Sequence, residues 1–403
     1  MAKAKSKPKK KSFGAGMGSV LASISSDTFH AGFGEHEDIW ADTGNYALNR
    51  MMSGRFDVGL LYGRQYVYFG ESGSGKTVAC AYLCGFEQVK NDAFVAWIDA
   101  ERSNTGQAGK KYLTKLGIDT SPDKFFYATA ATLEDINKQV AKMVSYYRAA
   151  LKEGTLDKLQ PMIIVIDSWG AVLTNTQMKN ATEGEMKGDQ GQLAKQTGDL
   201  IKKINHLVGN LPILTIGINH IYDNQEKNRV TGRVIGRKHK TTGGNKMIFM
   251  ASGVLMLTKK ELKGEDVESE VAKKAIKDFE SKTLAELKKD RKTVGIICQA
   301  ENLKSRVAKP FETVDVQIPW VGGMDPYSGL YDLLMAEGTV YVPATGWRAY
   351  LKDGKEVKFR EKEFRKKADA IMAAAPADIT DLTEEELEKV YEEEASTEET
   401  VSD

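Results

Sequence analysis

Eight residues, GESGSGKT from Gly70 to Thr77, have the types and spacing that suit phosphate binding. They match G-x-x-x-x-G-K-[ST] and lie between a predicted strand at residues 65–70 and a predicted helix that follows Lys76. Glycines let consecutive backbone N–H groups surround an anion, and the helix adds the positive end of its dipole. We expect Lys76 to reach the β- and γ-phosphates of a nucleotide. The expected nucleotide contacts in this segment are Gly70, Glu71, Ser72, Gly73, Ser74, Gly75, Lys76, Thr77 and Val78.

Two carboxylates follow predicted strands and could complete a hydrolytic site beside this loop. Asp167 ends the apolar run IIVID, at the strand edge where ligands of open α/β sheets bind. We expect Asp167 and Thr77 to hold Mg²⁺, although Asp167 could simply cap the next turn. Glu101 closes WIDAE and could orient the attacking water, but Asp99 competes for this role. Side chains two residues apart in a strand share a face, so the spacing leaves this choice open.

A cationic segment, NRVTGRVIGRKHKTTGGNK at residues 228–246, separates two apolar runs. It carries six Arg and Lys residues and no acid. An ordinary connection would have about two to six residues, so the length and charge of this one need an explanation. The simplest alternative is an exposed basic hairpin that contacts nothing.

Composition indicates an ordered chain with charged ends. The chain has 403 residues, of which 41% are hydrophobic, and a net charge of +1. Six lysines lie in the first 12 residues, whereas residues 378–403 hold twelve acids and one lysine, and such blocks often act as interaction tails. Three cysteines without a metal-type spacing argue against disulfides and zinc, and favour packing roles in a reducing, intracellular setting. No run reaches the roughly 18 apolar residues of a membrane span.

Alternating strand and helix patterns predict an α/β fold with a mostly parallel, twisted sheet. We expect a basic arm at residues 1–38 with a possible protomer-docking element, a core at 39–350, and a helical element with an acidic tail at 351–403. We also expect the charged residues 259–292 to form an insertion outside the sheet. The predicted strands are 65–70, 93–101, 161–169, 211–220, 253–258 and 293–306, and the predicted helices are 76–89, 132–154 and 191–209.

The order of these motifs resembles the RecA recombinases, over roughly residues 40–350. The later GGMDPYSGLYDLL and TGW are most similar to the strand-exchange recombinases of tailed phages, the UvsX type. The phosphate loop is shared by many ATPases, whereas TTGGN and KSRVAKPF are much more specific. The resemblance implies a RecA-like P-loop ATPase core flanked by small N- and C-terminal elements. The motifs that carry it are GESGSGKT, WIDAE, IIVIDSWGAV, LTIGINHIYD, TTGGNKMIFMAS and KSRVAKPF.

The resemblance also implies roles for single residues. Glu101, rather than Asp99, matches the residue that positions the hydrolytic water. Tyr112 matches an aromatic residue that stacks on adenine, although four extra residues separate it from Glu101. His220 falls where this family senses the γ-phosphate. Lys304 and Arg306 match two cations that reach the γ-phosphate of a neighbouring subunit, as an arginine finger does.

In this family the segment before TTGGN lines the filament axis and holds single-stranded DNA. A preceding polar loop, about residues 174–190, is the expected partner loop. Because His220 leads into the main loop, ATP could order that loop and so couple nucleotide state to DNA affinity. The expected DNA contacts are Arg229, Arg233, Arg237, Lys238, Lys240, Thr241, Thr242, Gly243, Gly244 and Asn245.

The function expected from the resemblance is homologous recombination with ATP and Mg²⁺ as cofactors. The protein would form filaments on single-stranded DNA, pair it with a homologous duplex and exchange strands. Expected partners are both DNAs, further copies of the chain, a single-strand-binding protein and a loading mediator, inside a phage-infected host cell. The alternatives are a hexameric RecA-fold helicase and a structural DNA-coating protein with an inactive nucleotide site.

Overall fold

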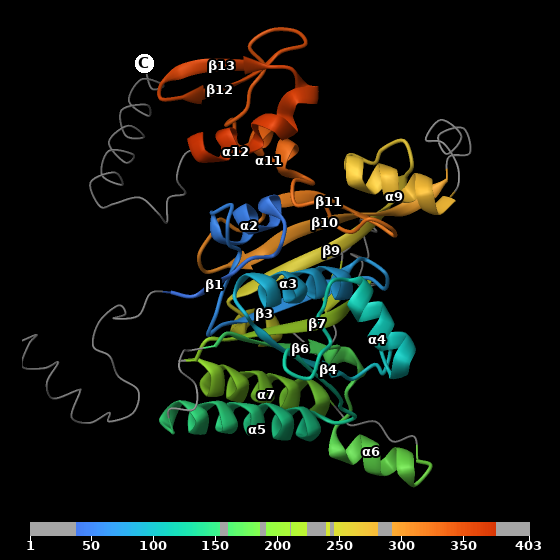
Figure 1. Ribbon diagram of the computed structural model, residues 1–403. Helices are drawn as coiled ribbons and strands as arrows, with labels where there is room; N and C mark the ends of the chain where they lie inside the picture. The colour runs from blue at the N-terminus through green and yellow to red at the C-terminus, as the bar shows by residue number, and fades with distance from the viewer. Residues whose placement is uncertain are drawn as a thin grey trace, which may run out of the picture. The chain divides into compact units, whose positions relative to one another are not determined.

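The computed structural model describes residues 38–153, 160–185, 191–209, 211–223, 239–241, 246–280 and 292–375. Residues from Trp40 onward form one compact unit. Its main feature is a sheet with nine strands in the described part of the chain, in the order β11-β10-β9-β3-β7-β6-β4-β5, with β8 paired to β7 (Figure 1). These strands are β3 (Gln65–Gly70), β4 (Phe94–Asp99), β5 (Phe125–Thr129), β6 (Met162–Asp167), β7 (Ile213–Asp223), β8 (His239–Thr241), β9 (Gly253–Lys263), β10 (Thr293–Ser305) and β11 (Thr313–Pro319).

The middle of this sheet is parallel, as the sequence predicted. β3 pairs in parallel with β7 and β9, and β6 pairs in parallel with β4 and β7. Every residue of β3 and β6 is buried, which explains why these strands appear as continuous apolar runs rather than alternating ones. The antiparallel pairs are β9–β10, β10–β11 and β7–β8. The expected α/β class with a mostly parallel sheet is therefore confirmed.

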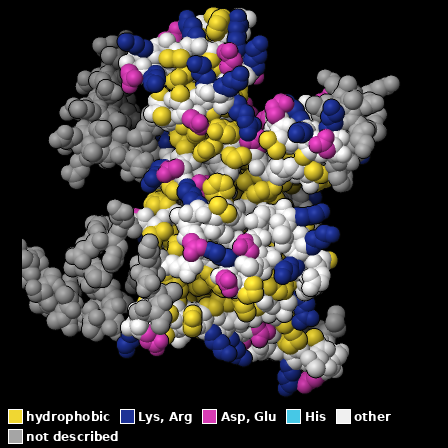
Figure 2. All heavy atoms as spheres, viewed as in Figure 1, with side chains coloured by type: hydrophobic (Ala, Val, Ile, Leu, Met, Phe, Trp, Pro, Cys, Tyr) yellow, Lys and Arg dark blue, Asp and Glu magenta, His cyan; other side chains and the backbone are white. Residues whose placement is uncertain are grey.

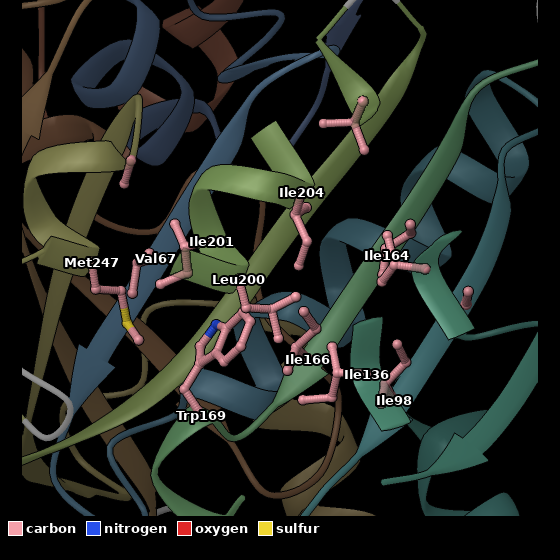
Figure 3. Close-up of a cluster of buried hydrophobic side chains, with 14 of the residues drawn as sticks. Val67, Ile98, Ile136, Ile164, Ile166, Trp169, Leu200, Ile201, Ile204 and Met247 are labelled. Carbon is pink, nitrogen blue, oxygen red and sulfur yellow. The ribbon is translucent and has the colours of Figure 1, made fainter. Parts of the chain in front are cut away.

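Helices pack along the sheet and hold the strand ends that carry the candidate site. The stripe on α5 (Leu133–Lys152) buries Ile136, Val140 and Val144, and Thr132 begins the helix with a capping box to Asp135. α5 lies beside α7 (Gln192–Val208), and both interdigitate with strand residues in the main apolar cluster (Figures 1 and 3). The remaining helices are α2 (Tyr46–Ser53), α3 (Lys76–Lys90), α4 (Gly106–Lys115), α6 (Asn175–Thr182), α8 (Lys246–Met250), α9 (Glu270–Glu280), α11 (Leu330–Ala336) and α12 (Phe364–Ala374), with short 3₁₀ turns at Trp169–Ala171 and Glu361–Glu363.

Three local expectations differ from the structure. The charged segment was expected to leave the sheet at residue 259, but β9 continues to Lys263, so its first five residues are part of the sheet. The region from 351 was expected to be helical, but β12 (Arg348–Lys352) and β13 (Lys355–Phe359) form a hairpin before α12. The polar loop at 174–190 contains α6, which Thr174 caps. In each case the segment concerned is short and mostly polar. It therefore lacks the long apolar period by which a strand or helix is recognised in a sequence.

The cysteines are packed as their sequence context indicated, whereas the charged ends at residues 1–12 and 378–403 lie outside the described residues. Cys80, Cys84 and Cys298 are buried free thiols, which confirms their packing role. Lys, Arg, Asp and Glu side chains are interspersed over the face seen in Figure 2. None of the helices within the described ranges is long and apolar enough to cross a membrane. A small antiparallel pair, β1 (Trp40–Ala41) and β2 (Leu60–Leu61), lies outside the main sheet.

Candidate nucleotide-binding site

The phosphate loop includes the five residues, 71–75, that join the end of β3 to the start of α3. Gly75 precedes the helix with φ of +94°, a left-handed conformation that favours glycine. A Cβ at Gly75 would also approach the Ile318 and Ile296 methyl groups at 3.0 and 3.3 Å. At Gly70 a Cβ would collide with the carbonyl oxygen of Leu257 on the neighbouring strand β9. The glycines therefore allow both the turn and its close packing on the sheet.

Lys76 begins α3 directly after this loop and is only 5% exposed. Its Nζ donates hydrogen bonds to the carbonyl oxygens of Gly70 at 3.0 Å and Glu71 at 2.7 Å. Burial lowers the pKa of Lys76, while Asp167 and Glu101 act in the opposite direction. A phosphate offered to this ammonium would replace two neutral acceptors with a charged one, which makes a shorter and stronger hydrogen bond.

Asp167 and Thr77 form a pair that suits a magnesium ion. The Thr77 hydroxyl donates to Asp167 Oδ2 at 3.1 Å, and Asp167 is 3% exposed at the end of β6. Burial, with the nearby charge of Glu101, raises the pKa of Asp167 to about 7. A hydroxyl and a carboxylate are oxygen ligands of the kind that Mg²⁺ uses beside nucleotide phosphates. The chemistry of these donors therefore fits the expected cation.

The structure separates the two carboxylates between which the residue spacing left the choice open. β4 ends at Asp99, which is fully buried and accepts hydrogen bonds from Asn104 N and the Tyr127 hydroxyl, both at 2.8 Å. Glu101 lies beyond the strand, so the alternation argument that placed both on one face was wrong. Glu101 Oε1 accepts a hydrogen bond from Ser168 Oγ at 2.5 Å. Asp99 thus shapes the following turn, whereas Glu101 belongs to the site.

His220 joins this site from β7. Its Nε2 lies 2.6 Å from Glu101 Oε1, and it is the register partner of Gly70 at the start of the phosphate loop. Burial opposes ionisation of Glu101, but the hydrogen bonds from Ser168 and His220 hold its pKa below the usual value. The carboxylate is therefore charged at neutral pH and able to accept a proton or orient a water molecule.

The strand that holds His220 also leads to the basic loop. The neighbouring Asn219 donates from Nδ2 to the sulfur of Met247 at 3.5 Å, and Met247 is buried on α8, where the chain returns from that loop (Figure 3). Described residues that precede and follow the loop are therefore in contact within the core. The backbone of Lys240 and Thr241 lies in β8, while the other expected DNA contacts, Arg229, Arg233, Arg237, Lys238, Thr242, Gly243, Gly244 and Asn245, lie outside the described residues.

Three further residues remain predictions in their roles. Lys304 donates from Nζ to the carbonyl oxygens of Ile248 at 3.0 Å and Phe249 at 2.8 Å, at the end of α8. Burial and the neighbouring Arg306 lower the pKa of Lys304. Tyr112 lies on α4 and is 42% exposed; burial, and after it the charge of Asp167, raises the pKa of its hydroxyl. The side chain is thus electrostatically linked to the site and accessible to a planar ligand.

Sequence reasoning missed two residues of this site. Ser168 directly follows Asp167, and only the turn after β6 directs its hydroxyl to Glu101. Lys259 Nζ donates to the carbonyl oxygen of Ser72 in the phosphate loop at 2.5 Å. Nothing in the sequence indicated that Lys259 would contact the phosphate loop. This contact depends on how far β9 extends beyond β3, which no local pattern shows.

This arrangement is that of a P-loop protein in which a carboxylate and a histidine bond each other at the carboxyl edge of the sheet. The RecA N-terminal domain matches residues 32–325 of the chain. The chain belongs to the RecA family.

Individual relatives agree with this family. A protein described as "Recombination and repair protein" from Enterobacteria phage T4 is 24% identical over 306 residues, which is 76% of this chain and 64% of the phage protein. The chain thus spans somewhat less than two thirds of that relative. Protein RecA of Chloroherpeton thalassium is 26% identical over 73% of this chain and 68% of its own length. Protein RecA of Frankia alni is 27% identical over 74% of this chain and 72% of its own length.

Replacing Asp167 with Asn should stabilise the nucleotide-free protein at alkaline pH. The folded protein retains the Asp167 proton up to about pH 7, whereas an unfolded chain releases it near pH 4, so the wild type loses stability between these values. Asn does not titrate, and the advantage of Asp167→Asn should reach on the order of 3 kcal/mol at pH 8. Urea unfolding at pH 5 and pH 8 measures it. An advantage that is the same at both pH values would contradict the buried, protonated carboxyl.

Proposed function

We propose that the protein is an ATP-dependent recombinase that forms filaments on single-stranded DNA, pairs it with a homologous duplex and exchanges strands. One observation carries this proposal. Two consecutive residues of β7 connect the candidate nucleotide site with the basic loop. His220 bonds Glu101 in the nucleotide site, and Asn219 bonds Met247 on the helix that follows the loop. The family membership and the basic character of the loop support the same function.

The chemistry proposed for the site is DNA-stimulated hydrolysis of ATP. Lys76 and the N–H groups of the phosphate loop bind the β- and γ-phosphates, and Thr77 and Asp167 hold Mg²⁺. The bound ion would neutralise charge on the phosphates. Glu101, ionised and oriented by Ser168 and His220, positions the attacking water and accepts its proton. Tyr112 offers its exposed ring face to the adenine base.

The proposed partners follow from the same function. The cations of the loop neutralise phosphates of single-stranded DNA, and homology is tested by base pairing with the second, duplex partner. Copies of the chain stack as a filament, with a single-strand-binding protein and a loading mediator acting on it in the host cytoplasm. The named relatives are a recombination and repair protein and RecA proteins, so they give no support to the helicase alternative.

Joint-molecule formation between a circular single strand and a homologous linear duplex tests the function directly. The wild type with ATP and Mg²⁺ should produce joint molecules, and Lys76→Ala should reduce their yield at least about 100-fold, because the principal phosphate ligand is lost. Gel electrophoresis measures the products. Wild-type protein that hydrolyses ATP but gives no joint molecules, or forms closed rings on DNA in electron micrographs, would favour the helicase instead.

A subunit-mixing experiment tests whether Lys304 and Arg306 act on a neighbour's nucleotide. Lys76→Ala alone, and the double variant Lys304→Ala/Arg306→Ala alone, should each hydrolyse ATP at a few per cent of the wild-type rate or less. An equal mixture should recover activity, because about a quarter of random interfaces then join an intact phosphate loop to intact cations. DNA-stimulated phosphate release measures this. A mixture no more active than its components would show that the cations do not act between subunits.

Replacing His220 with Ala should uncouple DNA binding from the nucleotide. We expect wild-type affinity for single-stranded DNA to be at least about tenfold higher with a non-hydrolysable ATP analogue than with ADP, and His220→Ala to bring this ratio near one. His220→Gln should retain part of the coupling, since its amide can still bond Glu101. The exposed His206→Ala on α7 is the control. Fluorescence anisotropy measures the ratio, and an unchanged ratio in His220→Ala would refute the coupling.

A further inference from the structure

The unequal lengths of two neighbouring strands place a lysine beside the phosphate loop. β3 and β9 are parallel, and Gly70, the last residue of β3, pairs with Leu257. The chain of β3 then turns into the phosphate loop, whereas β9 continues for six residues to Lys263. Lys259 lies two residues beyond Leu257 and therefore points to the same side of the sheet. This register directs its side chain along the loop.

Lys259 makes a direct contact with that loop. Its Nζ donates to the carbonyl oxygen of Ser72 at 2.5 Å. The same nitrogen lies 3.1 Å from the position that a Cβ on Gly73 would occupy. Gly73 has φ of +73°, so the backbone turns sharply at the point where the ammonium touches it. The contact is thus with the middle of the loop rather than with an end.

Two ammonium groups together bind three successive carbonyls of the loop. Lys76 takes those of Gly70 and Glu71, and Lys259 takes that of Ser72. An anion-binding loop directs its backbone N–H groups toward the anion. Its carbonyl oxygens then point away from the anion and need other hydrogen-bond donors. If Lys76 bonds a phosphate instead, its hydrogen bonds to the carbonyls of Gly70 and Glu71 are lost. The hydrogen bond from Lys259 to the carbonyl of Ser72 can remain.

We propose that Lys259 is a positioning residue that holds the phosphate loop in its anion-binding shape and raises its affinity for a nucleoside triphosphate. This inference rests on the proposed nucleotide-binding function and adds to it a residue outside the G-x-x-x-x-G-K-[ST] motif. The ammonium of Lys259 fixes the Ser72 carbonyl and contributes positive charge beside the phosphates. Its charge also contributes, after burial, to the lowered pKa of Lys76, so the two cations interact electrostatically.

The next residue of β9 offers a matched control. Lys260 is exposed, like Lys259, and successive side chains of a strand point to opposite faces. Its Nζ lies 3.4 Å from Asp315 Oδ2 on β11, an exposed ion pair of the kind that contributes little. Lys259→Met and Lys260→Met therefore remove the same charge from the same strand, and only the first change removes the contact with the loop.

The experiment compares ATP hydrolysis on single-stranded DNA, and binding of fluorescent ATP and ADP analogues, among the wild type, Lys259→Met, Lys259→Arg and Lys260→Met. We expect Lys259→Met to raise the KM and the Kd for ATP about tenfold and to change kcat less than about twofold. ATP should be affected more than ADP, because ATP carries more charge near the loop. The Kd of Lys259→Arg for ATP should lie within about threefold of the wild-type value, and the Kd of Lys260→Met should equal that of the wild type.

The possible results separate this inference from the proposed function. Wild-type protein that binds no ATP would contradict the function itself. Wild-type binding with equally tight binding by Lys259→Met would overturn only the role of Lys259. A fall in kcat with an unchanged KM would place Lys259 in the chemical step instead, and failure of Lys259→Arg to restore affinity would show that charge is not what matters. Thermal unfolding of each variant checks that the fold is intact.

Discussion

The hydrogen-bond register of four parallel strands is the constraint on which the whole site depends. Gly70 of β3 lies opposite His220 of β7, and Asp99 of β4 lies opposite Asp167 of β6. Parallel pairing places the carboxyl ends of these strands at one edge, where backbone groups are free to meet a ligand. A shift of one residue in the register of a strand would turn all of its side chains to the other face of the sheet. The apolar core beneath, between the sheet and α5 and α7, fixes this register (Figure 3).

The same edge concentrates charge in a buried place. Asp167 has little solvent around it and lies near Glu101, so its proton is held to about pH 7. Lys76 is the opposite charge that favours its ionised form, and burial in turn makes the ammonium easier to deprotonate. Buried charges of this kind are costly alone and become favourable when a ligand completes their partners. In the proposed function, a nucleotide and its magnesium ion would be such partners for Lys76 and Asp167.

The proposed DNA-binding loop and the proposed subunit contact of Lys304 would meet at α8. Met247 anchors the start of this short helix in the core, and Lys304 bonds the carbonyls of Ile248 and Phe249 at its end. If Lys304 turns toward a neighbouring subunit, those carbonyls lose a charged donor next to the segment that carries the basic loop. Nucleotide binding by a neighbouring subunit would thus change contacts at α8, the same helix that β7 contacts next to His220 within the chain. A two-sided connection of this type suits an assembly whose DNA affinity depends on ATP in every subunit.

The resemblance to the RecA recombinases, rather than any spacing, singled out Glu101 over Asp99 and suggested His220. The sequence by itself determined the class of fold, the phosphate loop and Asp167 as a candidate. It could do so because long buried strands and glycine-rich turns are local, and their physical requirements appear in consecutive residues. The tertiary structure showed that Asp99 shapes a turn while Glu101 bonds Ser168 and His220, because these contacts depend on where β4 ends. The contacts of Ser168 and Lys259 were likewise set by neighbouring strands and turns. Such contacts join residues that are distant along the chain, and no local pattern records the register that brings them together.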